Sequence, residues 1–363
     1  MTAEAPPPVR STTNELGAPS SRFIFHGFPL DRVNWMTSAF LMGTLALTLT
    51  AVPLYLWYFG LDWFQVALFF ALLAATGFSI TVGYHRLFSH ITFQASWPIR
   101  LFTLLFGAGA FENSVVMWAS EHRRHHKFVD HDHDDPYSIS KGFWYAHIGW
   151  LLFKVKPDPP FDNVADLQKD PLVRWQHRYI HLLAVTMGFV IPALLGGIWH
   201  GWPGALGGFL IGGVARIVVV QHGTFLINSA CHVMGRQPYS TKCSARDSWL
   251  LALLTLGEGY HNYHHEFQYD YRNGVRPWHV DPTKWTIWAL SKLGLARNLR
   301  RASPEKIRAA QLQALRIAQQ QKDFQSTAAR QQKQIEALTT GLQRVSAKVE
   351  MSKPATQMVV NNQ

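Results

Sequence analysis

The chain has 363 residues, a net charge of +11, 48% apolar residues and only 16% charged residues. This composition argues against a disordered chain, a coiled coil and a highly charged nucleic-acid-binding protein. Eight of the eleven net positive charges lie in residues 297–348, so the basicity belongs mainly to a tail. The two cysteines, Cys231 and Cys243, exclude a disulfide framework and favour a reducing compartment.

The sequence divides into three parts. Residues 1–21 are rich in Pro, Ser and Thr and predict a disordered segment. Residues 22–300 predict one domain, and residues 301–363 a basic, helical C-terminal tail. A solvated helix is the simplest interpretation of that tail, with attraction to anionic lipid headgroups as the alternative.

Long uncharged, apolar runs predict an all-α, multi-pass membrane protein. Four transmembrane helices in two hairpins are expected, at about residues 34–58, 63–84, 180–200 and 204–227. A further apolar stretch, 99–118, contains Arg100 and Glu112, and is expected to lie at the membrane surface.

Charges predict the orientation of these helices. Neither hairpin turn, at 59–62 and 201–203, contains Lys or Arg, whereas the flanking segments contain Arg22, Arg32, Arg86, Arg174 and Arg178. The positive-inside rule therefore places both termini and the region between the hairpins in the cytoplasm, as a helical domain.

Histidine is the unusual residue, with eighteen copies. Eight of them form three tight clusters: His85 and His90; His122, His125 and His126; and His261, His264 and His265. The second and third clusters have the i, i+3, i+4 spacing that puts three side chains on one helix face. The i, i+5 spacing of the first pair requires the helix to end between its members.

So many clustered imidazoles predict a metal site, because buried ring nitrogens without partners would cost about 1–3 kcal/mol each. Eight ligands exceed one tetrahedral ion and indicate two metals. Spacing alone leaves iron, copper and zinc open. A site beside an apolar hairpin suits oxidation of a lipid chain, which zinc cannot carry out because it has no redox states.

These residues resemble the membrane-bound fatty acyl desaturases of the stearoyl-CoA desaturase type, over about residues 30–300. The matching segments are GYHRLFSH (83–90), EHRRHHKF (121–128), NSACH (228–232) and GEGYHNYHHEF (257–267). Alkane hydroxylases and sterol oxidases carry similar single histidine boxes, but the ordered set is typical of desaturases.

The resemblance implies two iron ions held by nine histidines and, through a water, one asparagine. The matching residues are His85, His90, His122, His125, His126, Asn228, His232, His261, His264 and His265. One iron would take His85, His90, His122 and His126, and the other His125, His232, His261 and His265, with His264 less firmly assigned.

The implied reaction is the dioxygen-dependent insertion of a cis double bond, at carbon nine, into a saturated fatty acyl-CoA held in a bent apolar tunnel. Trp118 and Thr224 match residues that bend the chain, and Glu112 stands where the family has Gln. Asn113 matches a headgroup contact, whereas Ser120 replaces a family Arg. That departure leaves an acyl-lipid or acyl-carrier-protein substrate as an alternative.

The tunnel is expected to end near Gly77 and Leu73, at i−8 and i−12 from His85 on one helix. Neither tail contains an HPGG-type haem-binding segment, so electrons are expected from a separate ferredoxin or cytochrome b5 with its reductase. Arg123, Arg124 and Lys127 are basic residues that an acidic donor could meet.

A membrane di-iron hydroxylase and a membrane metal transporter are the competing hypotheses. No nucleic-acid partner is expected, because no basic motif is interleaved with aromatics. Two further interpretations concern polar residues: Asp247 is a candidate partner for the intramembrane Arg216, and Asp132, Asp134, Asp135, Glu258 and Glu266 are candidates to orient ligand histidines.

Overall fold

A computed structural model describes residues 24–25, 28–29, 32–153 and 161–352. The predicted disordered segment, 1–21, lies outside these residues. The described chain is mostly helical, which confirms the predicted dominance of helix. The sequence analysis did not predict the two antiparallel strand pairs, β1 (Ile24–Phe25) with β2 (Phe28–Pro29) and β3 (Gln94–Ala95) with β4 (Ala296–Arg297).

Three helical segments of the described chain are long and apolar enough to cross a membrane: Trp35–Phe59, Trp63–Ser89 and Ile180–Val233. The first is α1, capped by the Asn34 side chain. The second joins α2 (Trp63–Phe78), capped by Asp62, to the π-helix η2 (Ser79–Ser89). The third consists of α8 (Ile180–Val185), η5 (Thr186–Val190), α9 (Ile191–Gly207), η6 (Gly208–Ala215), α10 (Arg216–Asn228) and α11 (Ala230–Val233).

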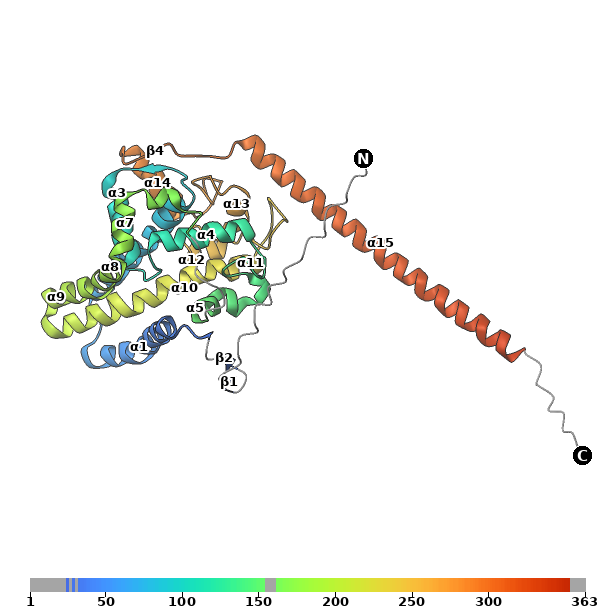
Figure 1. Ribbon diagram of the computed structural model, residues 1–363, viewed down its shortest axis with the longest axis horizontal. Coiled ribbons are helices and arrows are strands. Elements are labelled where there is room, and N and C mark those ends of the chain that lie inside the picture. Colours follow the sequence, from blue (N-terminus) through green and yellow to red (C-terminus); the bar gives the residue numbers. More distant parts are fainter. Residues whose placement is uncertain (1–23, 26–27, 30–31, 154–160, 353–363) are drawn as a thin grey trace, which may run out of the picture.

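The third segment contains both of the last two predicted spans, and it bends back on itself. His200 and Gly201 have non-helical dihedral angles, and Gly201 has a φ of 58°, a conformation that glycine adopts without strain. Beyond this bend the chain runs back, and η6 packs against α9 (Figure 1). Glycines allow the close approach, since a Cβ on Gly196 would lie 2.1 Å from the Gly204 carbonyl oxygen.

The apolar stretch predicted at 99–118 is broken in the structure. Helix α3 (Trp97–Ala108) ends before a turn in which Phe111 and Asn113 have positive φ, and α4 (Val115–Phe128) then begins at the capping residue Ser114. This turn gives α4, which contains the second histidine cluster, its own direction.

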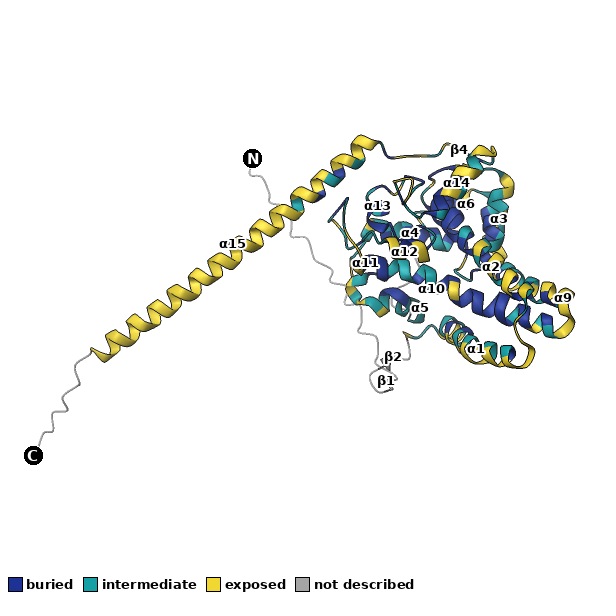
Figure 2. Cartoon of the chain, turned by 180° about the vertical axis from the view of Figure 1, so that it is seen from behind, coloured by how far each residue is buried: buried dark blue, intermediate teal, exposed yellow. Residues whose placement is uncertain are grey.

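Short helices build the rest of the domain. They are η3 (Ile139–Lys141), η4 (Tyr145–Gly149), α5 (Trp150–Leu152), α6 (Ala165–Gln168), α7 (Pro171–Arg178), α12 (Trp249–Leu254), α13 (His261–Glu266) and α14 (Pro282–Lys292). The long α15 (Pro304–Met351) follows and leaves the body of the protein, with most of its surface exposed (Figure 2).

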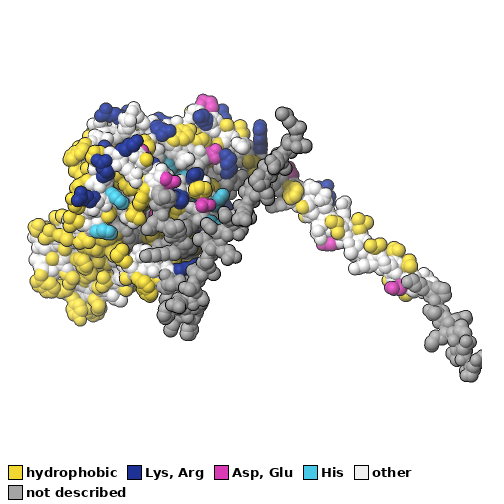
Figure 3. Space-filling view, viewed as in Figure 1, with side chains coloured by type: hydrophobic (Ala, Val, Ile, Leu, Met, Phe, Trp, Pro, Cys, Tyr) yellow, Lys and Arg dark blue, Asp and Glu magenta, His cyan; other side chains and the backbone are white. Residues whose placement is uncertain are grey.

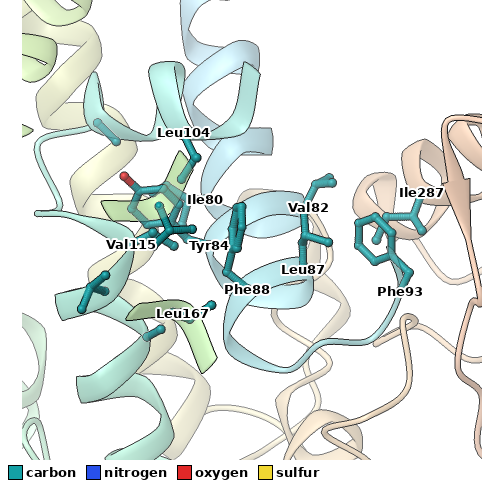
Figure 4. Close-up of a cluster of buried hydrophobic side chains, with 14 of the residues drawn as sticks. Ile80, Val82, Tyr84, Leu87, Phe88, Phe93, Leu104, Val115, Leu167 and Ile287 are labelled. Atoms are coloured by element: carbon teal, nitrogen blue, oxygen red, sulfur yellow. The ribbon is translucent and has the colours of Figure 1, made fainter. Parts of the chain in front are cut away.

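The main core packs around η2. Tyr84, Phe88, Leu104, Val115 and Ile287 are buried together, so that η2 contacts α3, α4 and α14 (Figure 4). All eleven residues of η2 are buried, including the polar residues His85 and Arg86. Neighbouring elements therefore pack against every face of this helix. The core thus fixes the element that carries the first histidine pair.

The surface divides by residue type. Hydrophobic side chains gather over the ends of α1 and α9, whereas Lys and Arg gather at the opposite end of the body, near α3 and β4 (Figure 3). The exposed apolar residues of the first region include Trp57, Ile198 and Trp202. This distribution is expected of a body immersed in lipid at one end.

Arg216 corrects one sequence interpretation. Its guanidinium is buried and donates to three backbone carbonyls, those of Gly109 (2.6 Å), Gly188 (3.2 Å) and Gly212 (3.1 Å). Asp247 instead accepts a hydrogen bond from the Tyr263 backbone N–H at 3.0 Å. Arg216 therefore ties backbone segments together and is not paired with Asp247.

Candidate metal centre

The first histidine pair lies at the end of η2. The helix ends at Ser89, between His85 and His90 as the spacing required, and the His90 N–H bonds to the His85 carbonyl at 3.1 Å. This i→i+5 bond closes a π turn, a feature often found at functional sites. The turn brings the two imidazoles within 4.9 Å of each other, centroid to centroid.

The other histidines come from three further helices. His122, His125 and His126 lie on α4, His261, His264 and His265 on α13, and His232 on α11. The sequence clusters alone did not predict His232, which stands apart from them and entered only through the resemblance.

The nine rings form two groups whose potential ligand atoms lie within 4.8 Å of one another. The first histidine group contains His85, His90, His122, His126 and His264, and the second contains His125, His232, His261 and His265. His264, whose assignment the resemblance left open, lies in the first group.

The Nε2 atoms within each group lie close to one another. In the first group, Nε2 of His90 lies 2.8 Å from that of His122, and Nε2 of His264 lies 2.9 Å from that of His126. In the second group, Nε2 of His261 lies 3.1 Å from those of His232 and His265. The rings of His126 and His265 stack at 4.3 Å, so the two groups adjoin.

The chemistry of these donors fits metal ions. His85 and His125 direct Nδ1 to carboxylates, which leaves their Nε2 lone pairs facing the centre of each group. The Nε2 atom of His125 is buried with no hydrogen-bond partner among the described residues. Lone pairs that face one another repel unless a cation lies between them.

The protonation state of the rings also favours metal binding. Burial, together with the neighbouring imidazoles, holds the pKa values of five rings well below the ordinary value of histidine: those of His122, His126, His261, His264 and His265. These rings are therefore neutral at pH 7, which is the state that binds a metal.

Carboxylates orient two of the candidate ligands. Glu258 Oε2 lies 2.8 Å from His85 Nδ1, and Asp135 Oδ1 lies 2.9 Å from His125 Nδ1. Both acids were among the five proposed for this role from the sequence. Of the other three, Asp132 accepts a hydrogen bond from Ser140, Asp134 is exposed, and Glu266 lies 3.9 Å from Lys242.

The outer nitrogen of His232 has a partner of another kind. Ser244 Oγ lies 2.6 Å from His232 Nδ1 and donates to Asp130 Oδ1, which is itself 3.9 Å from the ring nitrogen. Sequence reasoning missed Ser244 and Asp130, because 114 residues separate them and only the fold brings them together.

Glu258 belongs to a larger buried network. Arg86 Nη2 lies 2.8 Å from Glu258 Oε1 and 3.0 Å from Asp281 Oδ1, and Arg86 Nη1 donates to the Tyr271 carbonyl at 2.7 Å. Arg86, Glu258 and Asp281 are each at most 1% exposed. The two acids and one guanidinium therefore neutralise one another in part and fix the Glu258 carboxylate beside His85.

Glu112 joins the two residues expected to bend the substrate. The Trp118 indole N–H donates to Glu112 Oε2 at 3.2 Å, and the Thr224 hydroxyl donates to Glu112 Oε1 at 2.8 Å. The Trp118 ring in turn stacks on His122 at 4.8 Å. Burial raises the pKa of the Glu112 carboxyl to about 7. The three side chains thus form one unit against the first histidine group.

The remaining predicted site residues are more dispersed. Asn228 ends α10, four residues before His232, and Asn113 is exposed in the turn before α4. A Cβ on Gly77 would lie 3.0 Å from Leu256 Cδ1, and Leu73 packs against the main core. The π-helix between these positions and His85 changes the rotation per residue, so α-helical spacing does not by itself put them on one face.

Comparison with known proteins identifies the class of this protein. The fatty acid desaturase family model matches residues 61–297. The chain therefore belongs to the fatty acid desaturase family.

Three relatives illustrate the likeness. Acyl-CoA desaturase 1 of Saccharomyces cerevisiae is 38% identical over 294 residues, which cover 78% of this chain and 55% of the relative. A probable acyl-CoA desaturase of Schizosaccharomyces pombe is 46% identical over 227 residues, 62% of this chain and 47% of the relative. Human stearoyl-CoA desaturase is 36% identical over 263 residues, 70% of each chain. The chain thus spans about half the length of the two yeast relatives.

Proposed function

We propose that this protein is a dioxygen-dependent acyl-CoA desaturase that introduces a cis double bond, at carbon nine, into a saturated acyl chain. The convergence of nine imidazoles into two adjoining groups carries this proposal. The names of the relatives, acyl-CoA desaturase and stearoyl-CoA desaturase, support the substrate class.

Two iron ions are the cofactor of the proposed enzyme. The first histidine group would hold one iron and the second group the other, and Asn228 would contribute through a water. Bound iron would supply the activation of dioxygen that removal of hydrogen from an unactivated methylene requires. Zinc would suit the imidazoles equally well but has no redox states.

The protein itself positions the acyl chain. Trp118 and Thr224, joined through Glu112, would form a fixed wall beside His122 against which the chain bends. Asn113, exposed in the turn before α4, would contact the headgroup. The overall reaction consumes dioxygen, two electrons and two protons, and it releases the alkene and two waters.

Gly77 and Leu73 would close the far end of the tunnel. The Gly77→Leu variant should shift the product toward shorter acyl chains, because the added side chain fills the space beyond the bend. Gly43→Leu is the matched control, since nothing lies within 4 Å of a Cβ at Gly43. An unchanged chain-length profile for Gly77→Leu, measured by product analysis, would remove these two residues from the tunnel.

Four transmembrane crossings, with both termini and the histidine groups in the cytoplasm, are the proposed topology. The bend at His200 and Gly201 supports two crossings within the third apolar segment. The absence of Lys and Arg from the turns at 59–62 and 201–203 supports the orientation.

Electrons would come from a separate ferredoxin or cytochrome b5 with its reductase. A surface pocket supports a docking place for the donor, because His90 lines it beside Arg123 and Arg300. A donor held by these basic groups would touch a ring that belongs to the first histidine group.

Product analysis tests the proposed function. The full chain, expressed in cells that cannot make unsaturated fatty acids, should restore growth and yield a monounsaturated acyl chain. Gas chromatography–mass spectrometry should show the loss of two hydrogens and locate the double bond. A gain of one oxygen would instead identify a hydroxylase. Assays with purified acyl-CoA, acyl-carrier protein and phospholipid would identify the substrate carrier.

A further inference from the structure

Helix α15 has little contact with the rest of the protein. Its first turns are held, because Ser303 caps its N-terminus and Ile307, Ala310 and Ala314 pack against the body or are buried. From residue 318 to residue 352 every residue is exposed. Figures 1 and 2 show this part extending away from the body.

The exposed part of α15 carries a regular apolar stripe. Its residues, which we call the seam, are Ile335, Leu338, Leu342, Val345 and Val349, each between 56% and 73% exposed. Their spacings are three, four, three and four residues. Phe324 and Ile317 lie at earlier d positions of the same register, whereas the other core positions before the seam are Gln321, Ala328 and Gln331.

This spacing averages 3.5 residues, which is the repeat of a left-handed coiled coil. With Ile335 at position a, the seam occupies successive a and d positions of the heptad. In the first heptad Ile335 at a and Leu338 at d favour two parallel strands, whereas Leu342 at a and Val345 at d have the reverse arrangement. The partner that matches such a stripe is another helix with the same repeat.

The charges beside the seam favour a second copy of the same helix. Positions e and g, which face the partner across the seam, are Gln332, Gln334, Thr339, Gly341, Ser346 and Lys348. Only the last is charged, so two identical helices would not repel one another here. Gln331, at the d position before the seam, would meet its own copy only in a parallel, in-register pair.

The basic residues make a membrane surface the weaker partner. Arg330, Lys333 and Arg344 lie at positions c and f, on the side of the helix away from the seam. A helix lying in a lipid interface instead has a wide apolar face, with basic groups on the polar face near its edges. The seam is narrow and its neighbours are uncharged.

The helix itself also needs a partner. Isolated helices are marginal in water unless an apolar face packs, and Gly341 lowers the helix propensity in the middle of the seam. The seam begins 21 residues after Ala314, the last buried residue of the described chain, which is roughly 30 Å of helix.

We propose that α15 forms a parallel, two-stranded coiled coil with the α15 of a second copy of this chain, through the seam from Ile335 to Val349. The proposal rests on the repeat, the exposure and the charges of α15, and does not depend on the proposed enzymatic activity.

Cross-linking of the full chain in detergent tests the pairing and its direction. The d side chains of a parallel, in-register pair meet each other, within reach of a disulfide. Mild oxidation should therefore convert Leu338→Cys to a covalent dimer at least ten times faster than Thr340→Cys, which lies at the outward f position. The parent chain, with Cys231 buried and Cys243 half-buried, controls for the native thiols.

The molar mass of two double variants that introduce aspartates tests whether the seam forms the dimer. Light scattering should give the parent polypeptide twice the 41.2 kDa of one chain. Leu342→Asp with Val345→Asp should give one chain, whereas Thr340→Asp with Ala347→Asp, which adds the same charge at two f positions, should stay dimeric. A parent that is a single chain, or equal cross-linking of Leu338→Cys and Thr340→Cys, would overturn the proposal.

Discussion

The two histidine groups hold their rings by different means. In the first group, His85 is oriented by Glu258, which belongs to a network with Arg86 and Asp281 in the core. In the second group, His125 and His232 rely on separate contacts from two loops. A change in the first network should therefore cost more stability than a change at Asp135, which holds only its own loop through the backbone N–H groups of Asp130 and Tyr137.

The Arg86→Met variant should have the largest effect. It leaves two buried carboxylates facing each other without their cation, which costs about 3–5 kcal/mol. Thermal unfolding in detergent should show a large loss of stability and poor recovery of folded protein. Arg124→Met is the control, because its ion pair with Asp162 is long, at 3.8 Å, and exposed on the Asp162 side. Equal stability of the two variants would contradict the role given to the network.

Replacing Glu258 or Asp135 by its neutral amide allows a direct comparison of the first and second histidine groups. Both Glu258→Gln and Asp135→Asn should lower metal affinity by roughly 10–100-fold, since each removes a carboxylate from an outer ring nitrogen. Glu258→Gln should lower the melting temperature of the metal-free protein more than Asp135→Asn does, because it weakens the buried pairing of Arg86, whereas Asp135→Asn weakens only loop contacts with the Asp130 and Tyr137 backbone. Chelator competition and melting curves measure the two effects. A larger loss of metal-free stability in Asp135→Asn would reverse the comparison.

Ser244→Ala should act on the second group alone. Without the hydroxyl, His232 Nδ1 keeps only Asp130 at 3.9 Å, and metal affinity should fall by about 10-fold. Ser240→Ala, in the same loop, is the control, because Ser240 bonds to the Lys242 backbone N–H. The idea fails if the two serine variants retain metal equally.

Glu112 should give the smallest effect, and one that depends on pH. Its pKa is raised to about 7 by burial from an ordinary value near 4.5, so the stability it contributes is complete below pH 4.5 and is lost as the pH rises through about 7. The melting temperature of Glu112→Gln, relative to that of the parent, should therefore rise by roughly 2–4 °C between pH 5 and pH 8. A constant difference across that range would contradict the raised pKa.

The sequence predicted the parts of this site that repeat locally. The i, i+3, i+4 histidines needed only helical geometry, and Glu258 and Asp135 lie within ten residues of a box. Arg86 was seen in the first box, but its partner Asp281 lies 195 residues away along the chain. Ser244 and Asp130 likewise meet only through the fold.

The differences between the predicted and the observed fold also have physical causes. The i, i+5 pair predicted a helix end, but the π-helix that joins the two histidines depends on packing around η2, which periodicity does not reveal. Arg216 suggested an acidic partner, whereas three glycine positions supply carbonyls because their backbones approach closely. The basic composition of the tail predicted a solvated helix, whereas the proposed coiled coil rests on the exposure of its apolar stripe in the structure.

Metal analysis of active, purified protein tests the central claim most directly. The two histidine groups should hold two irons per chain, and removal of iron by a chelator should abolish desaturation until iron is returned. Fully active protein with far less than one iron per chain would contradict the account.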